Sequence, residues 1–307
     1  GYVPPHINKL GIDPADESFA VESRMVADEI IQDYFTLETY NKSKFKTKKA
    51  KVITCIAMFY DLDEPIDFLK DVVEVLDDDG LFVIQMSYTP LMIKQLAFDN
   101  ICHEHVYYWT LSSLNRLMKN ANLKIVDCQL NDVNGGSFRV YIKKQNSDMT
   151  KFATRPYRDV CDLRLESTYL WEENLENNLE EYWSDFFTGI TQLKEQTVNF
   201  IKEEKSKGKT ICGYGASTKG NTLLQYFGLD YSLIDAIAER SPYKYGHRTI
   251  GTNIPILSED DVRKMKPDYM LVLPWHFISE FTEREKEYLN GGGKFIVPCP
   301  KFEIIGK

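Results

Sequence analysis

The chain has 307 residues, of which 43% are hydrophobic and 27% charged, and its formal net charge is −9 at pH 7. At roughly 150 residues per domain, this length predicts two domains, each able to bury its own core. The composition is too apolar for general disorder, and the negative charge excludes unspecific binding to nucleic acid or to an anionic membrane surface.

The first 145 residues alternate strand and helix patterns. Lys-Leu-Gly-Ile-Asp-Pro, ending at Pro14, is expected to be the second strand of a unit whose first strand and glycine motif are missing or truncated. The expected elements that follow are a strand at 50–58, a helix at 66–76, a strand at 81–86, a helix at 111–120 capped by Thr110 or Ser112, and strands at 123–130 and 137–143. We expect residues 1–145 to form a Rossmann-like lobe.

The rest of the chain predicts a helical connector and a second lobe. Residues 146–208 are rich in Glu, Leu and Asn, and two stretches, 163–185 and 191–207, are expected to be helical. From Thr210 the strand, turn and helix pattern returns, with later strands expected at 233–238, 269–273 and 295–297. We therefore expect an α/β fold of two Rossmann-like lobes, 1–145 and 209–307, joined by the connector, with a substrate cleft between them.

Asp13 stands directly after a predicted strand, where nucleotide-binding Rossmann units hold ribose hydroxyls. A donor ribose is one interpretation of this carboxylate, and an ordinary Asp-Pro turn is the other. The glycine-rich loop that would precede such a strand is not in the sequence, so Asp13 carries the cofactor hypothesis without it.

The stretch Gly-Tyr-Gly-Ala-Ser-Thr-Lys-Gly-Asn follows a predicted strand and opens a helix, which leaves backbone N–H groups to cradle an anion. Ser217, Lys219 and Asn221 are the candidates for holding a pyrophosphate. Tight packing is the alternative role of the glycines. Glu239, at the end of the next predicted strand, completes a pattern that would also suit an NAD-dependent dehydrogenase.

The densest polar cluster is Asp-Asn-Ile-Cys-His-Glu-His at 99–105, which contains two of the five histidines. If this segment is extended, His103 and His105 share one face and Glu104 lies on the other. An imidazole that titrates near neutrality suits a general base. Structural histidines and a metal site are the alternatives, although the latter lacks a third ligand and the H-E-x-x-H spacing of zinc proteases.

The six cysteines lie far apart with no C-x-x-C pair, which indicates neither a zinc knuckle nor a disulfide framework. No apolar run approaches the roughly 20 residues that span a bilayer, and the first residues do not have the pattern of a signal peptide. We expect a cytoplasmic protein with no metal and no membrane partner.

Five motifs in order resemble those of the nucleotide-sugar C-methyltransferases that act on 4-keto-6-deoxy sugars. The resemblance covers nearly the whole chain. The motifs are Asp-Asn-Ile-Cys-His-Glu-His-Val-Tyr-Tyr at 99–108, Asn-Gly-Gly-Ser-Phe-Arg at 134–139, Gly-Tyr-Gly-Ala-Ser-Thr-Lys-Gly-Asn-Thr-Leu-Leu at 213–224, Arg-Ser-Pro-Tyr-Lys-Tyr-Gly at 240–246 and Leu-Pro-Trp-His at 273–276.

The resemblance implies an S-adenosylmethionine-dependent methyltransferase with a donor-binding lobe and a sugar-nucleotide lobe. The sequence departs from the family plan in three places. The four-cysteine zinc module and the acidic glycine-rich donor motif are absent from it, and Cys102 stands where well-studied members have Tyr. The expected partner is a nucleotide sugar, with no nucleic acid.

The implied reaction is carbon methylation at C3, next to the 4-ketone, through an enolate. His105 matches the position of the family's proposed base, and Glu104 and His103 would orient it and bind the sugar. The resemblance also adds Tyr60 to the donor pocket beside Asp13. Further candidate contacts to the substrate are Arg139, Arg240 and Lys244. The alternative interpretation of each is an ordinary surface charge.

Three alternatives stay open at this stage. An NAD-dependent oxidoreductase would use the Gly213 loop and Glu239. A non-catalytic sugar-nucleotide binding protein would bind without turnover, and an O-methyltransferase on the same fold would need the histidine but no ketone.

Overall fold

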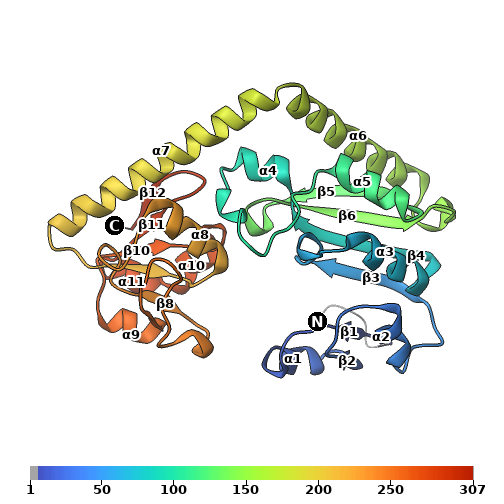
Figure 1. The fold of residues 1–307 in the computed structure, drawn as a ribbon, viewed down its shortest axis with the longest axis horizontal. Helices are drawn as coiled ribbons and strands as arrows, with labels where there is room; N and C mark the ends of the chain where they lie inside the picture. Colours follow the sequence, from blue (N-terminus) through green and yellow to red (C-terminus); the bar gives the residue numbers. More distant parts are fainter. Residues whose placement is uncertain (1–5, 307) are drawn as a thin grey trace. The chain divides into compact units, whose positions relative to one another are not determined.

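The computed structural model describes residues 6–306 and shows an α/β chain, which confirms the predicted fold class (Figure 1). The chain divides into two compact units. Unit 1 runs to Met86 and adds Trp109–Gln129 and Phe138–Trp171. Unit 2 consists of Ser87–Tyr108, Leu130–Ser137 and the chain from Glu172. The units are therefore interleaved in sequence and differ from the consecutive ranges 1–145, 146–208 and 209–307.

Unit 1 contains a two-stranded parallel sheet of β1 and β2 and most of a four-stranded sheet in the order β3-β4-β6-β5. β3 and β4 pair in parallel, so their carboxyl ends lie at the same edge. The strands are β1 (Leu10–Ile12), β2 (Glu29–Ile31), β3 (Ala50–Ile56), β4 (Leu76–Ser87), β5 (Leu123–Asn131) and β6 (Ser137–Lys144). Each strand expected in this part of the chain is present.

Four helices accompany these strands, and α5 shows how the sequence sets a boundary. The Thr110 side chain accepts the Ser113 backbone N–H at 3.1 Å, while the Ser113 side chain accepts that of Thr110 at 3.0 Å. This reciprocal cap satisfies two donors that a helix start leaves unpaired. The four helices are α1 (Glu17–Arg24), α2 (Leu37–Lys42), α3 (Pro65–Val75) and α5 (Leu111–Asn120).

Two long helices follow, α6 (Arg155–Asn177) and α7 (Leu179–Ser206), separated at Asn178. They confirm the helical prediction for this region. In unit 1, Arg164 of α6 makes a bidentate ion pair with the buried Asp127 of β5, at 2.8 and 2.7 Å. Two parallel N–H···O bonds to one carboxylate fix both partners in geometry, so this pair ties α6 to the sheet.

Unit 2 is built on a six-stranded sheet in the order β12-β11-β10-β7-β8-β9, parallel except for β12. Its central strands are almost entirely apolar and buried, as expected for a parallel sheet covered on both faces. The elements are β7 (Ile211–Tyr214), α8 (Thr218–Phe227), β8 (Ile237–Glu239), β9 (Ile256–Ser258), α9 (Glu259–Lys264), β10 (Tyr269–Val272), α10 (Ile278–Arg284), α11 (Lys286–Asn290), β11 (Lys294–Val297) and β12 (Glu303–Ile305). This confirms the second Rossmann-like pattern.

The segment 87–108 belongs to unit 2 because its apolar side chains join that core. It contains α4 (Thr89–Lys94) and the 3-10 turn η2 (Phe98–Asn100). The Phe98 ring packs on the rings of Tyr226 and Phe227 in α8, with centroids 5.1 and 5.4 Å apart. The polar motif that follows Phe98 is thereby held in the same unit as the glycine-rich loop.

Candidate active site

The motif at 99–105 forms a turn rather than the extended segment considered from the sequence. The His105 backbone N–H donates to the Cys102 carbonyl at 3.2 Å. The Asn100 side chain, at the start of this motif, makes two hydrogen bonds: its oxygen accepts from the Ser87 hydroxyl, and its amide nitrogen donates to the Ala97 carbonyl. These bonds curve the backbone, so His103 and Glu104 are exposed while His105 is half-buried.

The glycine-rich loop between β7 and α8 has the strand, turn and helix context that an anion site needs. Gly215 has φ +86°, and a Cβ there would come within 2.7 Å of Pro274, so only glycine fits. The Ser217 hydroxyl accepts the Gly220 N–H at 3.0 Å and caps α8. At the same helix start, the Thr218 hydroxyl donates to the Glu104 carboxylate at 3.1 Å.

Lys219, in the first turn of α8, points to the Asn-Gly-Gly turn. Its ammonium donates to the Asn134 carbonyl at 3.0 Å. Gly135, with φ +80°, lies against the Trp275 ring, which an added Cβ would approach to 3.0 Å. The turn at 134–136, the start of α8 and the Leu-Pro-Trp-His motif therefore meet in unit 2.

Asp99 is a buried carboxylate, 1% exposed, at the centre of these motifs. Trp275 donates its indole N–H to Asp99 Oδ2 at 3.0 Å. Burial raises the pKa of Asp99 to about 6, while the Lys219 charge and the Trp275 hydrogen bond act in the opposite direction. A buried carboxylate is costly without a partner, and Asp99 Oδ1 receives no hydrogen bond. The charge of Lys219 favours the ionised form without a direct ion pair.

Two histidines lie in the field of the Lys219 ammonium. Burial and then Lys219 lower the pKa of His105, against a hydrogen bond to the Asn100 backbone and the Glu104 charge, which raise it. Burial and Lys219 also lower the pKa of His276 to about 4. Both imidazoles are therefore biased toward the neutral form, the form in which a histidine accepts a proton.

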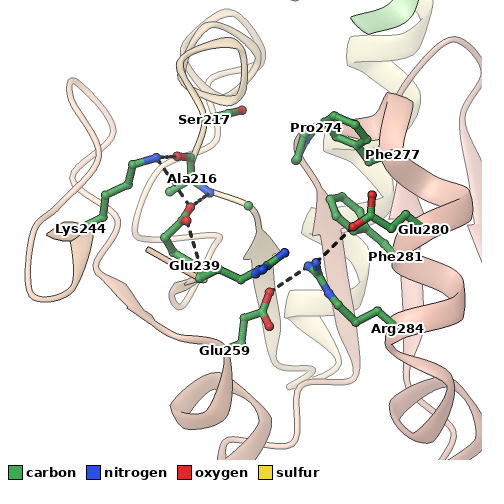
Figure 2. A pocket seen from close by; sticks show the side chains of 12 residues that line it. Ala216, Ser217, Glu239, Lys244, Glu259, Pro274, Phe277, Glu280, Phe281 and Arg284 are labelled. Carbon is green, nitrogen blue, oxygen red and sulfur yellow. Dashed lines mark hydrogen bonds and ion pairs between the residues drawn. The ribbon is translucent and has the colours of Figure 1, made fainter. Parts of the chain in front are cut away.

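A cavity of about 380 Å³ opens beside the glycine-rich loop (Figure 2). Three sequence-predicted residues, Ser217, Arg240 and Lys244, line it, and Lys244 donates to the Ala216 carbonyl at 2.7 Å. Glu239 accepts the Ala216 N–H at 2.8 Å and those of Arg240 and Ser241 at 3.0 and 2.9 Å. The cavity lining thus holds three cations and three carboxylates: Arg240, Lys244 and Arg284 with Glu239, Glu259 and Glu280. Arg284 is paired with Glu259 and Glu280, whereas Arg240 and Lys244 are exposed.

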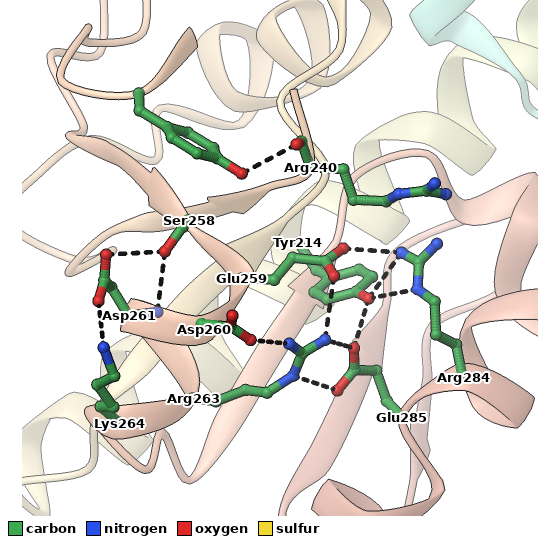
Figure 3. Close-up of polar contacts among 11 residues, drawn as sticks. Tyr214, Arg240, Ser258, Glu259, Asp260, Asp261, Arg263, Lys264, Arg284 and Glu285 are labelled. Carbon is green, nitrogen blue, oxygen red and sulfur yellow. Dashed lines mark hydrogen bonds and ion pairs between the residues drawn. The ribbon is translucent and has the colours of Figure 1, made fainter. Parts of the chain in front are cut away.

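A polar network behind the glycine-rich loop holds one wall of this cavity (Figure 3). The buried Tyr214 hydroxyl donates to Glu285 at 2.7 Å and accepts two bonds from Arg284, at 3.0 and 2.7 Å. Arg284 also donates to Glu259 at 2.9 Å. Because Arg284 and Glu259 line the cavity, the network fixes the position of its wall.

The remaining predicted residues lie outside this group. In unit 1, Asp13 accepts the Ala15 N–H at 2.8 Å, and Tyr60 is buried in η1 (Phe59–Asp61) after β3. Arg139 of β6 donates to Gln85 at 2.8 Å, also in unit 1. In unit 2, Asn221 is half-buried in α8 and does not line the cavity.

Sequence reasoning gave no role to Asp99, Trp275, His276 or Arg284. Three of them stand inside quoted motifs, and the available signal was a tryptophan and a histidine directly after a predicted strand, where parallel sheets place functional side chains. Arg284 carries no such signal, because it reaches the cavity from a helix distant in sequence.

Two family models divide the chain between them. The model of the C-methyltransferase C-terminal domain matches residues 132–300, and that of the methyltransferase domain matches residues 5–127. C-methyltransferase NovU from Streptomyces niveus is 31% identical over 296 residues, which cover 96% of this chain and 68% of the relative.

The chain belongs to the C-methyltransferase family. It is a methyltransferase whose methyl donor is S-adenosylmethionine, as the resemblance implied. Within residues 6–306, no three His, Cys, Asp or Glu side chains gather as a metal site would require, and no helix is long and apolar enough to cross a membrane.

Solved structures show only distant likeness. The plantazolicin methyltransferase BpumL, in complex with a pentazolic desmethylPZN analog and SAH, is 13% identical over 46% of this chain and 68% of its own, with a TM-score of 0.35. LepI in complex with SAM is 13% identical over 45% of this chain and 36% of its own, with a TM-score of 0.36. At this level the likeness says nothing about the substrate.

Proposed function

We propose that this C-methyltransferase methylates C3 of a nucleotide-linked 4-keto-6-deoxy sugar, with His105 as general base. The observation that carries the proposal is the juxtaposition in unit 2 of His105, biased toward the neutral form by burial and by Lys219, with a glycine-rich loop and a cavity whose lining includes Arg240 and Lys244. A neutral imidazole supplies the base, and the loop and cavity suit a diphosphate.

The reaction needs one proton transfer and one methyl transfer. The 4-ketone acidifies the C3 proton, which His105 removes. The electrons of the C3–H bond become the C3–C4 double bond, and the carbonyl pair moves onto oxygen to give the enolate. S-adenosylmethionine, when bound, supplies an electrophilic methyl group that C3 attacks, and the sulfur keeps the electrons of the broken S–CH₃ bond. Glu104 orients the base, and the exposed His103 binds the sugar.

Residues around the cavity are the proposed diphosphate site. Ser217, Arg240 and Lys244 line it, and the start of the ten-residue helix α8 adds the positive end of a helix dipole. Asn221 follows along the helix. Arg139 stays a proposed substrate contact, although in the structure its guanidinium is bonded to Gln85.

The donor residues fit the chemistry of S-adenosylmethionine. Asp13 is exposed just after the carboxyl end of β1, and its Oδ1 accepts the Ala15 N–H. An exposed carboxylate at this position suits a ribose diol. Tyr60 follows the carboxyl end of β3, the edge at which parallel sheets bind their ligands. We propose that both contact the donor.

The alternatives weigh less once the family is known. Membership in a C-methyltransferase family favours carbon over oxygen and argues against an NAD-dependent oxidoreductase. The Glu239 carboxylate, which a dehydrogenase would use for ribose, instead accepts three backbone N–H groups. A non-catalytic protein would bind the same sugar nucleotide, so only a measurement of turnover distinguishes it from the enzyme.

The test is mass spectrometry of the protein incubated with S-adenosylmethionine and a panel of nucleotide sugars, half of which carry a 4-ketone. The proposal predicts a gain of one methyl group by keto sugars only, with loss of the C3 proton. Methylation of sugars without a ketone would indicate oxygen as the acceptor. Binding of the sugars without any methylation would support the non-catalytic alternative.

A further inference from the structure

The proposed reaction leaves two charged side chains of unit 2 without a role, Asp99 and Lys219, which make no direct ion pair and are linked through Trp275 and the Asn-Gly-Gly turn. Asp99 is 1% exposed and Lys219 is half-buried, so both are largely withdrawn from water. Withdrawing a charge from water is costly, and here no direct ion pair offsets the cost. Two costly charges beside a catalytic segment are candidates for function.

The Lys219 ammonium is held in place from several sides. It donates to the Asn134 carbonyl at 3.0 Å, and Asn134 has the left-handed backbone conformation, φ 56°. The following glycine packs on Trp275, and Trp275 donates to Asp99 at 3.0 Å. The same tryptophan thus positions both the acceptor of the ammonium and its counter-ion.

Lys219 stands in the first turn of α8, next to Thr218, whose hydroxyl donates to the Glu104 carboxylate at 3.1 Å. Lys219 does not line the diphosphate cavity, whereas Lys244 and Arg240 do. Its charge acts on Asp99, Cys102, His105 and His276. His105, the proposed base, follows Glu104 directly in the sequence, so the start of α8 lies against the segment that takes the C3 proton. A fixed cation next to this segment is suited to the charge that an enolate develops.

We propose that Lys219 binds the enolate oxygen of the sugar and that Asp99 is the residue that positions its ammonium. This inference rests on the proposed function. When His105 takes the C3 proton, the negative charge appears on the C4 oxygen, and the ammonium compensates it without itself gaining or losing a proton. When C3 attacks the methyl group, the carbonyl is restored and the interaction weakens.

The charge also serves the base. A positive neighbour disfavours a second positive charge, so Lys219 keeps His105 neutral until substrate binds. Glu104 and the Asn100 backbone act on His105 in the opposite direction, and Asp99 offsets part of the Lys219 charge. The Asp99 charge therefore influences where the Lys219 ammonium lies and how strongly its positive field acts on His105 and on the enolate.

The experiment measures exchange of the C3 proton in deuterated water, with a keto-sugar nucleotide and no methyl donor. Lys219→Met removes the charge at similar length, Lys219→Arg keeps it, and Lys202→Met changes an exposed lysine of α7 as the control. Calorimetry on the same samples gives the affinity for the sugar nucleotide and shows that each variant is folded.

We expect Lys219→Met to slow exchange by about 10² to 10³-fold, the usual loss for one oxyanion donor, with affinity changed less than threefold. Lys219→Arg should retain part of the rate, and Lys202→Met all of it. Unchanged exchange in Lys219→Met, or a loss confined to affinity, would overturn the inference and return Lys219 to the diphosphate. If wild-type protein exchanges no keto sugar, the proposed function fails instead.

Asp99→Asn tests the positioning role separately, because an asparagine oxygen still accepts from Trp275. We expect a lower rate of exchange at saturating sugar, with KM unchanged and a rate between those of the wild type and Lys219→Met. The acid limb of the pH profile should also move to lower pH, because the Lys219 charge is then less compensated. A profile and rate equal to those of the wild type would leave Asp99 with a structural role only.

Discussion

Trp275 donates its indole N–H to Asp99 across 176 residues of sequence, at 3.0 Å. Phenylalanine at 275 would remove the donor and also the outer ring of the indole, whose Cη2 and Cζ2 lie nearest Gly135, and Trp183→Phe removes the same atoms. We expect Trp275→Phe to lower the free energy of unfolding by ~1–3 kcal/mol, the cost of leaving a buried group without its bond. Chemical denaturation measures this, with Trp183→Phe on the partly exposed face of α7 as control. Equal losses in the two variants would contradict a special role for the hydrogen bond.

Asp99 should make stability depend on pH. Its pKa rises from 3.8 to about 6 in the fold, so between these values the folded state holds a proton that the unfolded state has lost. Stability therefore falls as pH rises through this window. The asparagine in Asp99→Asn cannot ionise. We therefore expect the free energy of unfolding of this variant to exceed that of the wild type by at most about 3 kcal/mol at pH 8 and to equal it below pH 4. The exposed Asp185→Asn should show no such trend in thermal unfolding.

His105 should set the acid limb of the pH profile for kcat/KM. Burial and Lys219 lower its pKa below the usual 6.5, so the imidazole stays neutral to lower pH than an exposed histidine. The rate should rise with pH and reach its plateau below the usual range. Removing the positive charge in Lys219→Met should move this limb to higher pH. A shift toward lower pH in that variant would contradict the assigned electrostatics.

Gly135 and Gly208 offer a matched pair for testing the contact with Trp275. Both have positive φ, +80° and +77°, so alanine strains the backbone similarly at each. Only Gly135 meets Trp275, at 3.0 Å, whereas nothing lies within 4 Å of a Cβ at Gly208. We expect Gly135→Ala to lower the free energy of unfolding by about 1 kcal/mol or more beyond the loss in Gly208→Ala, because the added methyl group overpacks the Trp275 ring, and to reduce methylation. Equal losses of unfolding free energy in the two variants would show that the Trp275 ring moves aside without an energetic cost.

Local patterns in the sequence were enough to predict most of the strands and helices. Apolar runs bounded by turn residues predicted β7, β10 and β11, because buried parallel strands are apolar throughout. The β-branched run at 50–56 also predicted β3, although most of its side chains are exposed. The cap of α5 at Thr110 was among those predicted. The interleaving of the two units could not be predicted, because it depends on Phe98 packing against α8, a contact between residues more than 100 positions apart.

The site was predictable in its residue types and less so in its geometry. Ser217, Arg240 and Lys244 line one cavity, as a basic loop pattern suggests. The direction of Lys219 toward Asn134 follows from a turn fixed by Trp275, which no local pattern encodes. The turn at 102–105 likewise arises from side-chain bonds made by Ser87 and Asn100 rather than from the alternation of His103 and His105.

The most direct test of the central claim compares the wild type with His105→Gln and with the exposed His247→Gln, by mass spectrometry of a 4-keto sugar nucleotide incubated with S-adenosylmethionine. We expect His105→Gln to lose at least about 10²-fold in the rate of C3 methylation, the usual low end for a general base, while sugar-nucleotide affinity stays within about threefold. His247→Gln should retain the wild-type rate. Methylation at the wild-type rate by His105→Gln would contradict the proposed mechanism.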